Sequence, residues 1–437
     1  MNDLACKDAS HTPPKAPSPW ELYSSRSRRT FLLVLFLVGT LSYIDKGIIG
    51  VLLEPIKEEF HASDKMLGLL SGITFAVFYS TLGVPVARWA DRGDRKLVIT
   101  LSLAVWSVMT ALCGVASTFW QLAAARIAVG AGEAGALPAA QSLIADYYPP
   151  TARSRAIAIF MQSGTAGYSI ALVLGGFMAQ NYGWRSAFVS VGLAGLVFTP
   201  LVNLILKEPR RSAQFAFQRD WEESGARAVR ILLSKPAYRN VLGSIVLYYF
   251  MSYGVLVFMV PFIMRVHSLS VSQAGALYGT IGTGGSILGA LGGGMLADRL
   301  VARDLAWLAR VASCGFLGAV PLYELAFWSS NITAMLPALF LAITVLSAAV
   351  APMFSALHIV CGSKRRALSV AAALFVANLV GFGLGPVTSG ALSDWLGARY
   401  GTGEGLRYSL MIMIPLLLPA GWLMLRAGRH LKVDAED

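Results

Sequence analysis

The chain has 437 residues, of which 56% are hydrophobic and only 14% are charged. Soluble domains carry about 25% charged residues, so this composition excludes an ordinary soluble enzyme. In a soluble protein the formal net charge of +12 would suggest nucleic-acid binding. Here the position of the basic residues relative to the apolar runs decides what the charge means.

Apolar runs of about 20 residues, each long enough to cross a hydrocarbon core of ~30 Å, recur along the whole sequence. They predict an all-α membrane protein with twelve transmembrane helices. The expected spans are 30–52, 66–88, 97–117, 119–145, 154–179, 184–206, 241–264, 273–297, 306–328, 332–358, 367–391 and 407–427.

The basic residues are strongly biased to one side of these spans. The side with both chain ends holds 28 Lys and Arg residues, the opposite side holds 6, and Lys46 and Arg126 lie inside spans. Because positively charged loops stay in the cytoplasm, we expect both termini to be cytoplasmic and the acidic loop 53–65 to face outward. The basic excess is then a matter of topology, and no nucleic-acid partner is expected.

The spans divide the chain into two groups of six. We expect a disordered cytoplasmic tail over 1–29, where prolines precede the first apolar run. An N-terminal half over 30–206, a cytoplasmic linker over 207–240, a C-terminal half over 241–427 and a second cytoplasmic tail over 428–437 follow. The four cysteines show no metal-ligand spacing, so neither a metal site nor a disulfide framework is expected.

A repeated motif supports a duplication. Asp91-Arg92 follows the second span and Asp298-Arg299 follows the eighth, at an offset of 207 residues. A basic cluster at 153–155 opens the fifth span and another at 364–366 opens the eleventh, at an offset of 211. Two six-span halves joined by a charged linker are typical of duplicated transporters.

The repeated Asp-Arg loops and the twelve-span layout resemble the major facilitator superfamily, over essentially the whole chain. Four segments more narrowly resemble bacterial members of its Spinster-like branch: Ser42–Lys46, Leu53–Lys57, Ala90–Gly93 and Arg126–Ala134. The sequence departs from that branch at Lys46, where Arg is usual, at Ala87, where Gly is usual, and in the order of Gly93 and Asp94. Lys46 cannot make the bidentate contacts of an arginine.

Charged residues inside spans need a reason, because each costs about 2.5–3.5 kcal/mol at mid-bilayer. Asp45 and Arg126 both lie about seven residues, or ~10 Å, below the outer surface, so packing can bring them together. Glu133 follows Arg126 by two helical turns on the same face. Our hypothesis is that Asp45 and Glu133 exchange protons while Arg126 biases them. The alternative is a buried neutral network that includes Lys46.

Candidate substrate-binding residues are Lys46, Arg126, Tyr248, Tyr253 and Asn378. Lys46 points about 100° away from Asp45 around the helix, so it either contacts an anionic substrate group or pairs with another span. The tyrosines suit an amphipathic or aromatic substrate, although packing explains them equally simply.

The resemblance further implies an ionic latch at the cytoplasmic side. In it, Asp91 meets the N-terminal end of the eleventh span and Arg95 links it to Asp146, while Asp298 faces the fifth span. The alternative is that these loops only anchor the chain at the interface. The candidate gate residues are Asp91, Arg92, Arg95, Asp146, Asp298 and Arg299.

A glycine-rich stretch in the eighth span has a structural explanation. Residues 282–285 resemble a phosphate cradle, but no Gly-Lys-Ser/Thr follows and no strand precedes, so neither a nucleotide nor another cofactor is expected. Gly285, Gly289 and Gly293 recur at every fourth residue. That spacing predicts a face of close helix packing.

These observations favour a secondary active transporter in a bacterial inner membrane, driven by the proton gradient and working by alternating access. The family resemblance implies a monomer. The Spinster-like resemblance implies lysolipid or sphingoid-like substrates. Small organic anions or drugs are the alternative substrates. A passive channel or a non-transporting sensor is the alternative of another class.

Overall fold

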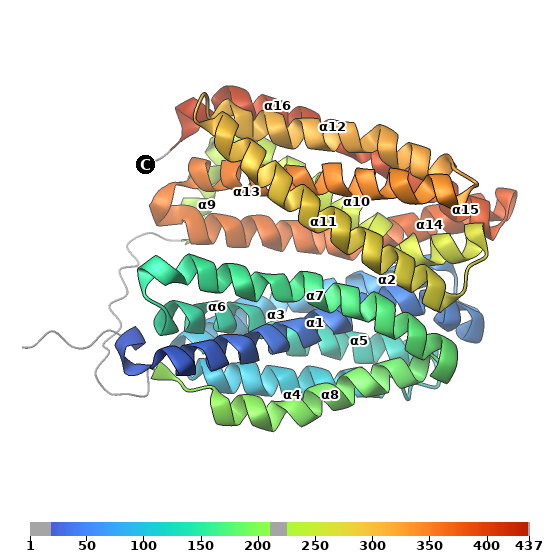
Figure 1. Ribbon diagram of the computed structural model, residues 1–437, viewed down its shortest axis with the longest axis horizontal. Helices are drawn as coiled ribbons and strands as arrows, with labels where there is room; N and C mark the ends of the chain where they lie inside the picture. Colours follow the sequence, from blue (N-terminus) through green and yellow to red (C-terminus); the bar gives the residue numbers. More distant parts are fainter. Residues whose placement is uncertain (1–18, 210–224, 436–437) are drawn as a thin grey trace, which may run out of the picture.

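The computed structural model describes residues 19–209 and 225–435, which are almost entirely helical (Figure 1). The elements are η1 Pro19–Leu22, α1 Ser25–Phe60, α2 Asp64–Ser71, α3 Ile73–Arg92, α4 Arg95–Cys113, α5 Phe119–Glu133, α6 Ala136–Tyr147, α7 Pro150–Tyr182, α8 Trp184–Ile205, α9 Gly225–Ser234, α10 Pro236–His267, α11 Val271–Val301, α12 Ala306–Trp328, α13 Ile332–Val376, η3 Ala377–Phe382, α14 Gly383–Tyr400, α15 Thr402–Met413, η4 Ile414–Leu416 and α16 Leu417–Asp434.

Ten helical segments within the described part of the chain are long and apolar enough to cross a membrane. The two other expected spans, 119–145 and 273–297, are helical but are not both long enough and apolar enough to count among these ten. One is divided into α5 and α6 at Gly135, so neither piece is long enough alone. The other is α11, whose many glycines contribute no apolar side chain. The tenth expected span and the start of the eleventh both fall in α13, where Gly362, with φ 63°, interrupts the helix. The eleventh span then continues through η3 and α14.

The helices form two bundles, α1–α8 and α10–α16, that lie against each other along their length (Figure 1). In the first bundle α1 packs on α7, α3 on α5 and α4 on α8. In the second bundle α10 packs on α14, α11 on α13 and α12 on α16. The same pairs of spans therefore meet in both bundles, as a duplicated architecture requires.

The bundles join through two similar contacts, α2 with α14 and α7 with α11, and through α1 with α10. We call the end where α1 begins and α16 ends the terminal end, and the opposite one the far end. Near the far end, glycines bring the backbones together. A Cβ on Gly390 would lie 2.1 Å from the Asp64 carbonyl oxygen, and one on Gly275 would lie 2.4 Å from that of Leu172.

The glycine face predicted in the eighth span is confirmed. In α11, a Cβ on Gly289 would lie 2.1 Å from the Thr344 carbonyl oxygen, and one on Gly293 would lie 2.2 Å from that of Ala348. The absence of side chains at these positions lets α13 approach α11 closely.

The boundaries expected for the chain ends need correction. Residues 1–18 of the expected tail lie outside the described residues, but 19–29 are mostly helical. Ser24 caps α1 by accepting a hydrogen bond from the Ser27 amide, and the Tyr23 ring stacks on Tyr147 at 4.0 Å between centroids. These contacts order a segment that its prolines alone would leave disordered.

The other expected tail, 428–437, is also helical as far as Asp434. Its last turn is held by Lys235, which precedes α10, and by Ala237 of α10. The Lys235 ammonium donates to the Asp434 carbonyl oxygen at 3.0 Å, and the Ala237 amide donates to the Asp434 carboxylate at 2.8 Å. The span expected from 241 also begins earlier, at Pro236. The helix α9 occupies part of the expected linker 207–240.

Candidate functional site

The first buried ion pair joins α1 to α5. Arg126 donates through Nη1 to an Asp45 carboxylate oxygen at 2.9 Å, and the exposed fractions of the two side chains are 1% and 0%. This is the contact expected from their matching depth. Thr110 of α4 donates to the other Asp45 oxygen at 2.5 Å, so the carboxylate is held from two helices. Thr110 was not predicted from the sequence, because a threonine in a span is commonplace.

A second ion pair joins Lys46 of α1, which is 16% exposed, to the buried Glu133 of α5. Ser42 lies one turn before Lys46, accepts a hydrogen bond from its ammonium at 2.7 Å, and donates to Glu133 at 3.1 Å. Of the two expectations for Lys46, the structure thus has it paired with another span. Asp45 and Lys46 leave α1 in different directions, so each acid of the predicted ladder has its own cation.

Aromatic rings surround the second pair and separate it from the first. The Lys46 ammonium lies 5.2 Å from the ring centre of Tyr43 and 5.4 Å from those of Phe75 and Tyr79. The Arg126 guanidinium lies 5.6 Å from the same Phe75 ring. Both cations therefore gain cation–π attraction, and Phe75 of α3 is the common neighbour of the two ion pairs.

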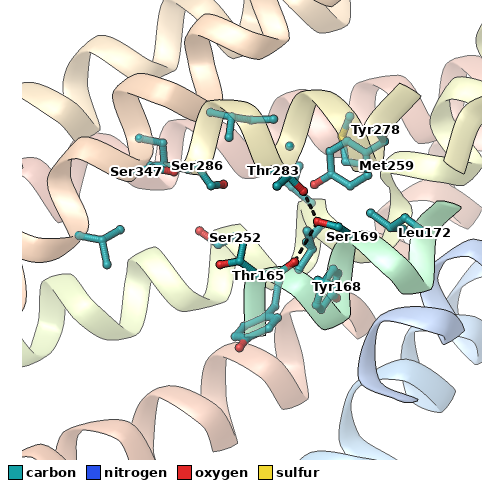
Figure 2. A pocket seen from close by; sticks show the side chains of 18 of the residues that line it. Thr165, Tyr168, Ser169, Leu172, Ser252, Met259, Tyr278, Thr283, Ser286 and Ser347 are labelled. Atoms are coloured by element: carbon teal, nitrogen blue, oxygen red, sulfur yellow. Dashed lines mark hydrogen bonds between the residues drawn. The ribbon is translucent and has the colours of Figure 1, made fainter. Parts of the chain in front are cut away.

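A central cavity of about 360 Å³ lies between the bundles, lined by α1, α7, α10, α11, α12 and α13 (Figure 2). Ser169 of α7 and Thr283 of α11 hydrogen-bond to each other across it, which links the two bundles inside the cavity. Tyr248 and Tyr253, predicted as substrate-binding, line this cavity. Tyr168 and Tyr278 also line it, and the sequence analysis did not single them out.

The other predicted substrate-binding residues do not line the central cavity. Lys46 and Glu133 line a separate space of about 30 Å³, with room for about one or two water molecules. Arg126 and Asn378 are in the lining of neither; Asn378 lies in the π-helical segment η3. Tyr43 is shared by the two cavities. The tyrosine therefore stands between the central cavity and the Lys46–Glu133 pair.

At the far end, Arg265 of α10 ties the second bundle to the first. Its guanidinium makes two hydrogen bonds to Asp64, at 2.7 and 2.8 Å, and donates through Nε to both Glu54 oxygens at 2.9 Å. Lys57 of α1 also pairs with Asp64 at 2.7 Å. The arginine is 7% exposed, so this cluster is shielded from solvent.

Two residues of α14 complete this far-end cluster. Ser393 donates to Asp64 at 2.6 Å, and the Asp394 carboxylate accepts from the amides of Asp64 and Lys65 at 2.8 Å each. These amides begin α2, so a carboxylate from the second bundle caps a helix of the first, where negative charge is favoured. The sequence analysis placed the acidic loop outside but did not predict this cluster, because its partners are about 200 or more residues away.

At the terminal end, Arg95 is fully buried and pairs with Asp146 at 2.6 Å, as the latch hypothesis expects. It also pairs with Glu208 at 2.5 Å, a partner not predicted. The side chains of Asp91 and Arg92 and of the basic cluster at 364–366 lie outside the described residues. Asp298 and Arg299 are exposed on α11.

The family profile of the Major Facilitator Superfamily matches residues 35–379. The chain belongs to this superfamily. An "MFS-type efflux pump" of Mycolicibacterium smegmatis is 34% identical over 390 residues, which cover 89% of each chain. "Protein spinster homolog 1" of Xenopus tropicalis is 27% identical over 94% of this chain and 82% of its own.

A solved structure of a bacterial homologue of the human lysosomal transporter Spinster, inward-facing and unoccupied, superimposes with a TM-score of 0.86. It is 30% identical, and the match covers 95% of this chain and all of that one. Together these relatives confirm the Spinster-like resemblance and the twelve-helix fold. The chain is therefore an integral membrane protein of a transporter family and not an enzyme.

Proposed function

We propose that the protein is a proton-coupled secondary active transporter that moves a small amphipathic solute across a bacterial inner membrane by alternating access. The observation that carries this proposal is the pair of buried ion pairs on α1 and α5, next to a central cavity. Intramembrane carboxylates that face the interior of a helix bundle and have a basic partner are typical of proton relays.

The coupling step follows from the chemistry of the Lys46–Glu133 pair. A proton that binds Glu133 removes its negative charge and releases the ammonium of Lys46, which remains among aromatic rings. Asp45 responds in the same way towards Arg126. Either event changes how tightly α1 is held to α5, and α1 also packs on α10 of the second bundle. A proton can thereby bias the relative position of the bundles.

The sidedness in this proposal comes from the basic residues. Since the terminal end carries most of them, it faces the cytoplasm together with both chain ends. The far-end cluster then closes the outer side, and the structure corresponds to an inward-facing state. The likeness to a bacterial structure solved inward-facing and unoccupied supports this assignment.

The substrate class rests on the relatives and the cavity. The first candidate is the lysolipid or sphingoid-like amphiphile that the resemblance to Spinster proteins implies, and the likeness to Spinster relatives supports that resemblance. Small organic anions are the second candidate.

We propose that the protein works as a monomer, because each chain holds a complete central cavity between its own two bundles.

The test is flux into proteoliposomes with an imposed pH gradient, with lysophospholipids and small organic anions as substrates. We expect gradient-dependent flux in the native chain and its loss in both Asp45→Asn and Glu133→Gln. Glu58→Gln is the matched control, because Glu58 is an exposed carboxylate on α1. Flux that stays pH-dependent in both buried variants would show that the ion pairs are structural.

A further inference from the structure

The central cavity has an unusual chemical lining. Seven tyrosines and six serines or threonines line it, and the remaining residues are glycine, methionine and aliphatic. Among the lining residues that the structure describes there is no Lys, Arg, His, Asp or Glu. The polar side-chain groups of these described lining residues are neutral hydroxyls.

Several of these hydroxyls are available to a ligand. No hydrogen bond of the Tyr168, Tyr253 or Tyr278 hydroxyl is found within the described part of the chain, although each residue belongs to the cavity wall. Figure 2 shows Tyr168 and Tyr278 beside the bonded pair Ser169 and Thr283. Hydroxyls in such a cavity need partners, which water supplies when the cavity is empty and a solute supplies when it is filled.

The charged side chains of Lys46 and Glu133 lie near the central cavity but do not line it. The Lys46 ammonium is engaged by Glu133 and lies with it in the separate small space. The Tyr43 ring, 5.2 Å from that ammonium, stands between them and the central cavity. An anionic group that entered the central cavity would lose its hydration without gaining a cation, which is costly.

We propose that the central cavity selects an uncharged amphiphile, whose hydroxyl, ester or ether oxygens bond to the tyrosine, serine and threonine hydroxyls and whose chain packs on the aliphatic residues. This inference rests on the proposed transport function and changes its substrate class, because an uncharged amphiphile takes the place of the charged lysolipids and organic anions. It discriminates between neutral and anionic molecules of the same size, because only the neutral molecule keeps all its polar atoms satisfied after desolvation.

The test compares three ligands with one acyl chain and different headgroups: 1-decanoylglycerol, which is neutral, decanoyl lysophosphatidic acid, which is anionic, and decanoylcholine, which is cationic. Binding to the purified full-length protein in nanodiscs is measured by isothermal titration calorimetry. We expect the glyceride to bind with a Kd about tenfold or more below those of the other two. Tighter binding of either charged ligand, or no binding of the glyceride, overturns the proposal.

Two variants sharpen the result. Ser347 belongs to the cavity wall (Figure 2), so Ser347→Lys introduces the missing cation and should raise the affinity for lysophosphatidic acid about tenfold while lowering that for the glyceride. Tyr278→Phe keeps the ring and removes one hydroxyl, so it should weaken only glyceride binding. An unchanged order of affinities in both variants also overturns the proposal.

The binding measurement uses no pH gradient, so it separates this inference from the proposed coupling. If the ligand preference holds but flux ignores the gradient, the proton-coupling proposal fails alone. If flux responds to the gradient but the anionic ligand binds best, the substrate inference fails alone.

Discussion

At the scale of single residues, Lys46 and Phe75 decide how the buried charges are organised. The Phe75 ring faces both Lys46 and Arg126, so the two cations share one aromatic neighbour but have different carboxylate partners. Close approach at this point is possible because Gly130 has no side chain; a Cβ there would lie 2.7 Å from the Phe75 carbonyl oxygen. Two neutral ion pairs are thus packed side by side without a direct contact between like charges.

Replacing Lys46 separates the effects of charge and shape. Lys46→Met leaves Glu133 buried without its cation, and losing one partner of a buried pair costs about 3–5 kcal/mol. We expect a lower melting temperature and flux that no longer depends on the pH gradient. Lys46→Arg retains the pair and should keep both properties near the native values. Native-like coupling in Lys46→Met would contradict a role for this pair.

Thr110 holds the Asp45 carboxylate on the side away from Arg126. Thr110→Val removes a hydrogen bond to a charged group, which contributes about 1.5–3 kcal/mol. We expect the melting temperature in detergent to fall and the pH profile of flux to shift. Thr81→Val is the control, since Thr81 is exposed and bonds only to its own helix; an equal loss in both variants would show that Thr110 has no special role.

At the scale of elements, the far end is closed by α1, α2, α10 and α14 together. Backbone contact at Gly390 sets the distance between α2 and α14, and the charges of Arg265 and Asp394 then meet the first bundle. The closure combines short-range packing with ion pairs. Opening the far end must break both at once, as expected of a two-state gate.

Arg265→Gln tests the charge part of this closure. It removes the ion pairs to Glu54 and Asp64, and each ~1.4 kcal/mol lost lowers the ratio of closed to open molecules about tenfold. We expect distances between spin labels on the far ends of α2 and α14 to shift towards longer values. Arg185→Gln, which breaks the Glu59 pair within the first bundle, should leave these distances unchanged; equal shifts in both variants would contradict the assignment.

The spans and one ion pair could be predicted from the sequence, whereas contacts between distant parts of the chain could not. Apolar length predicted the spans, since hydropathy is a local property, and matching depth predicted the Asp45–Arg126 contact. The pairing of Lys46 was left open, because it depends on the rotation of α1 against α5. The far-end cluster was missed, because Arg265 and Asp64 are far apart in sequence and meet only after the bundles join. Asn378 lies in η3, outside the lining of the central cavity, so its predicted role in substrate binding stays a prediction.

At the scale of the whole molecule, the two bundles hold different parts of the mechanism. The two ion pairs between α1 and α5 belong to the first bundle, whereas Tyr248, Tyr253 and Tyr278 of the central cavity come from the second. Tyr43 and α7 bring the first bundle to the same cavity. Substrate and proton would therefore act mainly on opposite bundles, and the rocking of one against the other would couple them.

The orientation of the molecule in the membrane is the last prediction. The distribution of Lys and Arg predicts that the terminal end is cytoplasmic. A cysteine that replaces Lys65, at the start of α2, should therefore react with a membrane-impermeant maleimide in intact cells. A cysteine that replaces Arg429, near the end of α16, should react only after the membrane is opened. Lys65 and Arg429 are both exposed, so access to the reagent depends on sidedness. The opposite pattern would invert the topology, and the far-end cluster would then close the cytoplasmic side.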